Sequence, residues 1–125
     1  QAVPTTISGV KRLVQTLKSG GSVGLLPDQV PLRGLGVWAP FFGREAYTMT
    51  LAARLAAHAD VVLLIWGERL SWGRGYVIHV RPAPEVLAED KQQAAAQINR
   101  WMESLIRQQP GQYLWGYNRY KPPHD

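Results

Sequence analysis

The strongest constraint on the fold is an uninterrupted apolar segment, Val61 to Trp66, near the middle of a chain of 125 residues. The segment is short, rich in β-branched residues and free of polar positions, which is typical of a strand covered on both faces. It is far shorter than the roughly 18 to 20 apolar residues of a membrane-spanning helix, so no such span is expected. Because helices must cover such a strand from two sides, we expect an α/β fold.

Three helices and several short strands are expected around this segment. Apolar residues recur every three or four positions over residues 9–19 and from Asp90 to just before Pro110, and alanine and leucine favour a helix over residues 45–58. The remaining strands are expected at residues 22–26, 36–39 and 75–81. These elements predict a single domain over residues 1–125, built as a small mixed sheet covered by helices.

The charge balance indicates a partner that is both apolar and anionic. Charged residues make up only 18% of the chain, and 14 Lys and Arg against 9 Asp and Glu give a net charge of +5. Five tryptophans accompany this excess of positive charge. A membrane face and a nucleic acid both fit this composition. The absence of cysteine excludes disulfides, a cysteine-based zinc site and a cysteine nucleophile.

The histidines offer neither a catalytic base nor a metal site. His58 is followed five positions later by Leu63 and His79 by Pro84, and His124 lies almost at the end of the chain. No pair of histidines has the spacing of metal ligands, and neither a G-x-S-x-G motif nor a phosphate-binding P-loop occurs. We therefore expect no catalytic residue, no metal and no cofactor in this chain.

A carboxylate and an amide, Asp28 and Gln29, follow directly after the strand expected at residues 22–26. In open α/β sheets, ligands bind just beyond the carboxyl ends of strands, which makes this pair a candidate site. The alternative is simple turn chemistry, because an Asp after Pro27 commonly closes a loop. Spacing alone favours the turn.

Two aromatic segments are further candidates. Phe41 and Phe42 are adjacent in a loop, where one ring could line an apolar groove and ordinary loop packing is the alternative. Residues 112–121 interleave aromatic side chains with Arg and Lys. Such a segment can stack on bases, lie at a lipid interface, or pack back on the core with its cations in solvent. The net charge does not separate these alternatives.

Several short motifs occur in series along nearly the whole chain. They are Leu26-Pro27-Asp28-Gln29, Trp38-Ala39-Pro40-Phe41-Phe42-Gly43, Ala46-Tyr47-Thr48, Trp66-Gly67-Glu68-Arg69, Asn99-Arg100 with Glu103, Pro110, Gln112-Tyr113-Leu114-Trp115 and Asn118-Arg119-Tyr120-Lys121. In this order and spacing they resemble the bacterial lipid A biosynthesis acyltransferases, the lauroyl and myristoyl acyltransferase family. The resemblance implies the C-terminal part of a glycerolipid-acyltransferase-like fold, so that the chain is expected to be a fragment of a larger acyltransferase domain.

The same resemblance implies an enzyme at the cytoplasmic face of the bacterial inner membrane. Such enzymes move a fatty acyl group from acyl carrier protein to a hydroxyacyl chain of a lipid A precursor. The family uses a His-x4-Asp/Glu dyad, in which the histidine is the general base on the acceptor hydroxyl and the acid orients the imidazole. Because the dyad and the membrane helix of the family lie upstream of the matched region, the chain alone is expected to be soluble and inactive.

Candidate substrate-binding residues are also implied by the resemblance. Asp28 and Gln29 are expected to line the site near a substrate phosphate. An aromatic loop beside the acyl or acceptor groove corresponds to Phe41, Phe42 and Gly43. Contacts with an anionic head group are expected from Arg69, Arg119 and Lys121.

Two other functions remain as alternatives. A small basic module could bind nucleic acid, with an affinity that falls steeply with salt. The basic residues are scattered, however, so nucleic acid is not the expected partner. A stand-alone interaction domain would instead expose a strand edge and an apolar face, and would self-associate.

Overall fold

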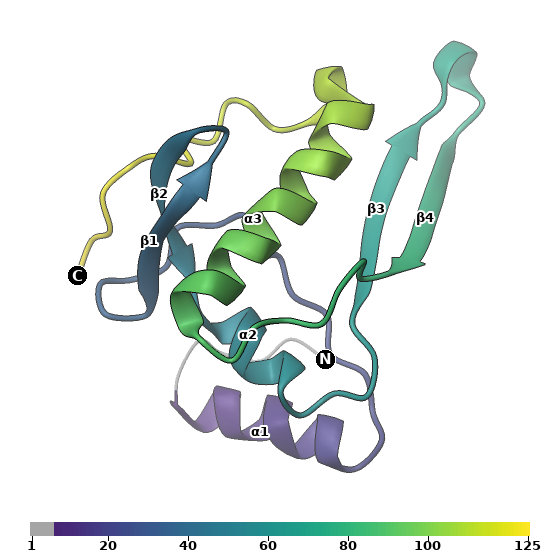
Figure 1. Ribbon diagram of the computed structural model, residues 1–125. Coiled ribbons are helices and arrows are strands. Elements are labelled where there is room, and N and C mark those ends of the chain that lie inside the picture. Colours follow the sequence, from purple (N-terminus) through teal and green to yellow (C-terminus); the bar gives the residue numbers. More distant parts are fainter. Residues whose placement is uncertain (1–6) are drawn as a thin grey trace.

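The computed structural model describes residues 7–125, so residues 1–6 of the expected domain lie outside the described part. The described residues form the helices α1 (Ile7–Lys18), α2 (Leu51–Ala56) and α3 (Lys91–Gln108), the strands β1 (Gly36–Phe41), β2 (Arg44–Met49), β3 (Leu63–Arg69) and β4 (Tyr76–Pro82), and the short 3₁₀ turns η1 (Ser71–Gly73) and η2 (Pro110–Gln112). In Figure 1, α3 runs between the β1–β2 hairpin and the β3–β4 hairpin. Within residues 7–125, no helix has both the length and the apolar character needed to span a bilayer.

The strands pair as two separate antiparallel hairpins, β1 with β2 and β3 with β4. The expected mixture of helices and strands is confirmed, but the described strands do not join into the single small mixed sheet that the sequence predicts. Only Phe42 and Gly43 connect β1 to β2, and a short loop containing η1 connects β3 to β4. Such short connections favour antiparallel pairing of neighbours, whereas a parallel pair needs a long crossover.

Helix α3 supplies much of the core, and its prediction is confirmed. Its N-cap, Asp90, accepts hydrogen bonds from the backbone N–H groups of Gln92 and Gln93 at 3.1 and 2.9 Å. The buried residues of the helix are Ala94, Ala95, Ile98, Asn99, Trp101 and Ile106. They pack on the β1–β2 hairpin, where Phe41 and Ala46 are also buried.

The helix expected over residues 45–58 is only partly present. Its first half is strand β2, and helix α2 begins at Leu51. Within β2, Ala46, Tyr47 and Thr48 are all buried. Burial in a hairpin therefore outweighs the helix propensity of the alanines, which is a weak local preference.

One strand prediction is wrong, and another is wrong in part. Residues 22–26 form no strand, and the two leucines among them are exposed. The central apolar segment does form most of β3, but its residues alternate between half-buried and exposed along the strand. It is therefore covered on one face by the described residues, not on both. The last expected strand is confirmed as β4.

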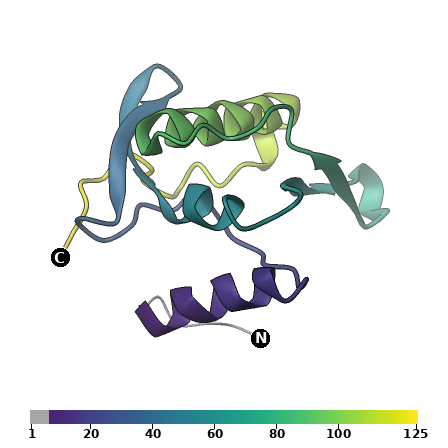
Figure 2. The same ribbon diagram turned by 60° about the horizontal axis from the view of Figure 1, so that its bottom comes forward.

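Helix α1 lies to one side of the other elements. Figure 2 shows it running below α2 and away from α3. The helix ends at Lys18, and Gly20 follows with a φ of 79°, the left-handed conformation that commonly ends a helix. The elements that position the candidate site are therefore α3, the two hairpins and the chain after α3.

Candidate functional site

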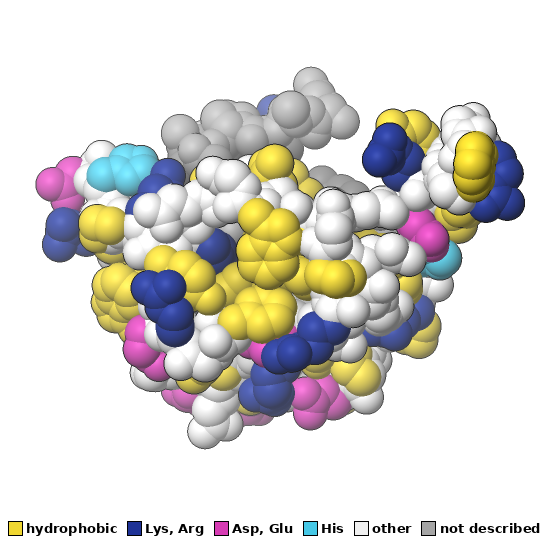
Figure 3. All heavy atoms as spheres, turned by 90° about the horizontal axis from the view of Figure 1, so that it is seen from above, with side chains coloured by type: hydrophobic (Ala, Val, Ile, Leu, Met, Phe, Trp, Pro, Cys, Tyr) yellow, Lys and Arg dark blue, Asp and Glu magenta, His cyan; other side chains and the backbone are white. Residues whose placement is uncertain are grey.

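The candidate site lies where the β1–β2 turn, the loop at residues 27–30 and the C-terminal tail, residues 113–121, come together. The Val30 N–H donates to Tyr117 Oη at 2.8 Å, and Tyr120 Oη donates to the Phe41 carbonyl oxygen at 2.8 Å. A pocket of about 250 Å³ opens here, lined by Phe41, Tyr113, Trp115, Gly116, Tyr117, Asn118, Arg119 and Tyr120. Figure 3 shows hydrophobic side chains gathered on this upper face of the molecule, with Lys and Arg side chains beside them.

The β1–β2 turn holds Phe42 and Gly43 in left-handed backbone conformations, with φ of 47° and 75°. Two positive φ values are typical of a type I′ turn, whose twist suits a β-hairpin. Glycine adopts this conformation freely, whereas phenylalanine does so rarely. The Phe42 N–H donates to Glu103 Oε1 at 2.8 Å, and its ring lies 4.9 Å from the Phe41 ring and 5.0 Å from the Arg107 guanidinium. The predicted aromatic loop is thus a tight turn anchored on α3.

We expect Gly43→Ala to lower the free energy of unfolding by about 1–2 kcal/mol, because alanine is strained at positive φ. No heavy atom lies within 4 Å of a Cβ added at Gly43, so the cost comes from the backbone and not from a clash. The matched control is Gly24→Ala, at another open position without a positive φ, where alanine should be neutral or slightly stabilising. Urea denaturation of both variants checks this, and equal midpoints would contradict the turn conformation.

Arg119 is buried, with 3% of its surface exposed, and links the tail to β2 and α3. Its Nη1 donates to the Tyr47 carbonyl oxygen at 2.8 Å, and its Nη2 donates to Thr48 Oγ1 at 2.8 Å and Asn99 Oδ1 at 3.4 Å. Asn99 Nδ2 donates to Thr48 Oγ1 at 3.0 Å and to the Pro40 carbonyl oxygen at 2.9 Å. The structure thus places Arg119 inside the fold, with both Nη atoms engaged in hydrogen bonds. Its Nε has no partner but is itself buried, so no guanidinium atom faces outward toward a head group.

Asp28 lies within electrostatic range of this network. Burial lowers the pKa of the Arg119 guanidinium below its usual value, and the phenols of Tyr113 and Tyr117 and the Asp28 carboxylate oppose that shift. Burial also raises the pKa of Tyr113, and the charge of Asp28 raises it further. The structure therefore brings Asp28 and Arg119, two of the predicted site residues, into one cluster with Tyr113.

The backbone around Asp28 forms a turn, which is the alternative that the spacing of Pro27 and Asp28 favours. Asp28 follows Pro27 in this turn and is half-buried, whereas Gln29 is exposed. Because residues 22–26 form no strand, the pair does not lie at the carboxyl end of a strand. The groups that lie near Asp28, Tyr113 and Arg119, belong to the C-terminal tail.

The two adjacent phenylalanines have different environments. Phe41 is 1% exposed and belongs to the hydrophobic core with Ala46 and Ile106. Phe42 is half-buried, and its ring lies 6.1 Å from that of Trp115 in the tail. Phe42 is therefore the ring that the site presents outward.

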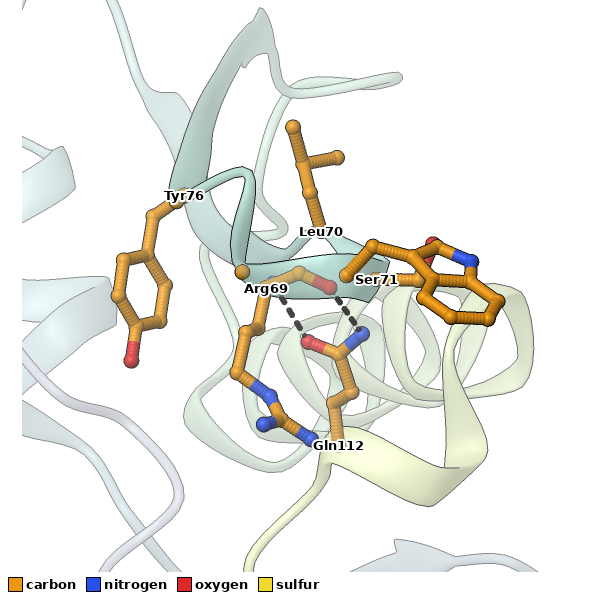
Figure 4. Close-up of a pocket in the computed structure, with 8 residues that line it drawn as sticks. Arg69, Leu70, Ser71, Tyr76 and Gln112 are labelled. Carbon is orange, nitrogen blue, oxygen red and sulfur yellow. Dashed lines mark hydrogen bonds between the residues drawn. The ribbon is translucent and has the colours of Figure 1, made fainter.

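Lys121 and Arg69 lie at the two ends of the tail. Lys121 Nζ is 5.1 Å from the centre of the Tyr117 ring. Arg69 ends β3 and lines a second pocket of about 490 Å³, shown in Figure 4. There the Gln112 side chain accepts from the Arg69 N–H at 2.7 Å and donates to the Arg69 carbonyl oxygen at 3.0 Å, as a neighbouring strand would. Since Gln112 directly precedes Tyr113, the two pockets lie on either side of the start of the tail.

A histidine–carboxylate pair also occurs that sequence spacing missed. His79 Nε2 lies 2.8 Å from Glu68 Oε2, and the His79 ring stacks on Trp66 at 4.8 Å. The strand register, which sets Trp66 opposite His79, brings these residues together. Gln109 of α3 also donates to Glu68 Oε1 at 3.1 Å, so the pair fastens the β3–β4 hairpin to α3. No group of three His, Asp or Glu side chains within residues 7–125 is placed to hold a metal ion.

Comparison with known proteins gives one consistent family. The family model described as bacterial lipid A biosynthesis acyltransferase matches residues 2–122. The chain is 33% identical over 118 residues to the lipid A biosynthesis palmitoleoyltransferase of Escherichia coli (strain K12), which covers 91% of this chain and 38% of that protein. It is 28% identical over 115 residues to the lipid A biosynthesis lauroyltransferase of the same organism, covering 90% of this chain and 38% of that protein. The chain thus spans well under half the length of these relatives.

Proposed function

The chain belongs to the bacterial lipid A biosynthesis acyltransferase family, and from this we propose that it is the substrate-binding, C-terminal part of such an enzyme. In the proposed reaction, a fatty acyl group passes from acyl carrier protein to a lipid A precursor at the cytoplasmic face of the inner membrane. The match of the family over residues 2–122 is the observation that carries this proposal.

The geometry of the candidate site supports a lipid-binding role. Its pocket is walled by aromatic side chains of the tail, and Phe42 and Trp115 present apolar surface beside it. Such surface suits an acyl chain. The half-buried carboxylate of Asp28 can accept hydrogen bonds from hydroxyl or amide groups of a sugar head group, and Lys121 can pair with its phosphate.

The proton chemistry of the proposed reaction requires a group from outside these residues. A general base must take the proton of the acceptor hydroxyl as that oxygen attacks the thioester carbonyl. Neither His58 nor His79 has an acid five positions later, as the dyad of the family requires. His79 is instead held between Glu68 and Trp66 on the hairpin. We therefore assign binding of the substrate, and not proton transfer, to this chain.

The experiment that tests the proposal measures binding and transfer separately. We expect the purified chain to bind a lipid A precursor in detergent micelles, and to transfer acyl groups from acyl carrier protein at the uncatalysed rate. A missing general base alone costs roughly 10²- to 10⁴-fold. Asp28→Asn should weaken precursor binding about 10- to 100-fold, since a hydrogen bond to a charged group contributes about 1.5–3 kcal/mol. Asp60→Asn, at an exposed aspartate after α2, is the control and should bind normally.

Two outcomes would contradict this assignment. Robust transfer by the chain alone would show that the base lies within these residues. Equal precursor affinity of Asp28→Asn and the unaltered chain would remove Asp28 from the site.

A further inference from the structure

The β3–β4 hairpin has two faces of opposite character. On the face toward α3, Trp66 stacks on His79, the Arg81 guanidinium lies 5.2 Å from the Trp66 ring, and Gln109 reaches Glu68. Both carboxylate oxygens of Glu68 have partners on this face, His79 Nε2 and the Gln109 amide. The hairpin is therefore fastened from one side only.

The opposite face is apolar and uncovered by the described residues. The register pairs Ile65 with Val80 and places Ile78 opposite Gly67, so these side chains share one face with Leu63. Ile65 is 63% exposed, Ile78 65% and Val80 56%. Exposed apolar side chains in such a cluster mark a surface that meets another phase or molecule.

The tip of the hairpin, residues 69–76, adds aromatic and basic side chains to this face. Trp72 is 95% exposed and Tyr76 is 74% exposed. Arg69 and Arg74 flank them, and no Asp or Glu occurs between residues 69 and 81. In Figure 3 the tip stands apart from the body of the molecule at the right and carries both hydrophobic and basic side chains.

Trp72 is also strained. Its φ is 61°, a left-handed conformation that tryptophan rarely adopts. Backbone strain of this kind costs free energy, and it clusters at functional segments. Here the strain directs a large aromatic side chain into solvent, with nothing in the described fold to cover it.

From these observations we infer that the tip and the apolar face of the β3–β4 hairpin dock on the surface of an anionic lipid bilayer. Aromatic rings with an apolar body and a polar edge lie at head-group depth, and neighbouring arginines pair with lipid phosphates. A protein partner would need only the apolar strands, whereas the concentration of Trp72, Tyr76, Arg69 and Arg74 at one end matches the layered chemistry of a bilayer surface.

The hairpin is held in position for this role by the Gln112 clamp on Arg69. Figure 4 shows both hydrogen bonds, with the Arg69 and Tyr76 side chains beside them. Because Gln112 directly precedes the tail that lines the candidate site, docking of the tip would set that site at a fixed height above the membrane. This inference rests on the proposed function, because the proposed function puts the acceptor lipid in the membrane surface on which the hairpin docks.

The test is sedimentation of the whole chain with vesicles of phosphatidylethanolamine and phosphatidylglycerol, and with vesicles of phosphatidylcholine alone. We expect binding to the anionic vesicles that weakens as salt is added, and little binding to the neutral ones. Arg74→Gln should weaken binding about fivefold. Trp72→Gly should weaken it on the order of tenfold, while glycine relieves the positive φ and keeps the hairpin folded.

Matched controls lie outside the hairpin. Val86→Ser removes another highly exposed apolar side chain, and Arg54→Gln removes an exposed cation of α2. Both should bind vesicles like the unaltered chain. As an independent readout, brominated lipids should quench the fluorescence of the unaltered chain more than that of Trp72→Gly, and the difference reports Trp72.

The inference is overturned if Trp72→Gly and Arg74→Gln bind anionic vesicles as the controls do. It is also overturned if the chain ignores vesicles and forms a dimer in light scattering that Ile78→Ser abolishes, because the face would then be a protein interface. Precursor binding in micelles involves no bilayer. Its failure would therefore count against the proposed function alone, and failed vesicle binding with intact precursor binding would count against the hairpin alone.

Discussion

Arg119→Met is expected to lower the free energy of unfolding by about 2–4 kcal/mol. The substitution keeps an unbranched side chain but removes the donors that reach the Tyr47 carbonyl oxygen, Thr48 Oγ1 and Asn99 Oδ1. Thr48 Oγ1 still accepts from Asn99 Nδ2 in the variant, whereas Asn99 Oδ1 loses the Arg119 donor. A buried acceptor left without a donor costs about 1–3 kcal/mol, and part of this is recovered because the buried charge itself is gone. Urea denaturation followed by circular dichroism measures the loss.

Two further variants show whether the loss comes from the network. Arg54→Met, at an exposed arginine of α2, should change stability by less than about 0.5 kcal/mol. Combining Arg119→Met with Asn99→Leu should cost less than the sum of the two single changes, since both remove the same buried contacts. Full additivity, or an Arg119→Met chain as stable as the Arg54→Met control, would show that Arg119 does not join the tail to the core.

The parts of the fold that sequence predicts are those with local signals. Helix α3 carries a cap at Asp90 and a periodic apolar face. Strand β4 follows a turn that contains Gly73 and Gly75, and its residues alternate in polarity, so the sequence predicts both elements. The start of the 45–58 segment became β2 because a turn with two positive φ values, at Phe42 and Gly43, folds it back on β1. That preference depends on pairing with β1 across the turn, which the helix propensities of the individual residues do not contain.

The candidate site likewise has parts that the sequence predicts and parts that only the structure shows. The resemblance predicts that Asp28 and the aromatic turn line one site, and in the structure both lie beside the tail. The resemblance does not predict that Arg119 points inward. An arginine in a basic and aromatic segment is expected at the surface, and only the structure shows its contacts with Thr48 and Asn99. The Asn99 amide on the buried face of α3 was the available signal, since a buried amide needs polar partners from another segment.

Phe41→Ala is expected to have the largest effect, about 3–5 kcal/mol of stability. Phe41 is 1% exposed, packs with Ala46 and Ile106, and has the Tyr120 ring 6.1 Å away. Truncation removes the largest fully buried side chain of the described fold and leaves a cavity beneath the tail. Because the Arg119 guanidinium lies 5.3 Å from the same ring, the tail should loosen with the core.

The matched comparison is between the two adjacent phenylalanines. Phe41→Leu keeps most of the volume and should cost roughly 1.5 kcal/mol or less, and Phe42→Ala should cost less than Phe41→Ala because Phe42 is only half-buried. The binding assay should show the reverse order, with Phe42→Ala weakening precursor binding more than Phe41→Leu, since Phe42 and not Phe41 faces outward beside Trp115. Phe41 also lines the pocket, but its ring lies in the core beneath it. If Phe41→Leu lost precursor binding at unchanged stability, the expected order of the two phenylalanines would be contradicted, and Phe41 would contact the precursor directly.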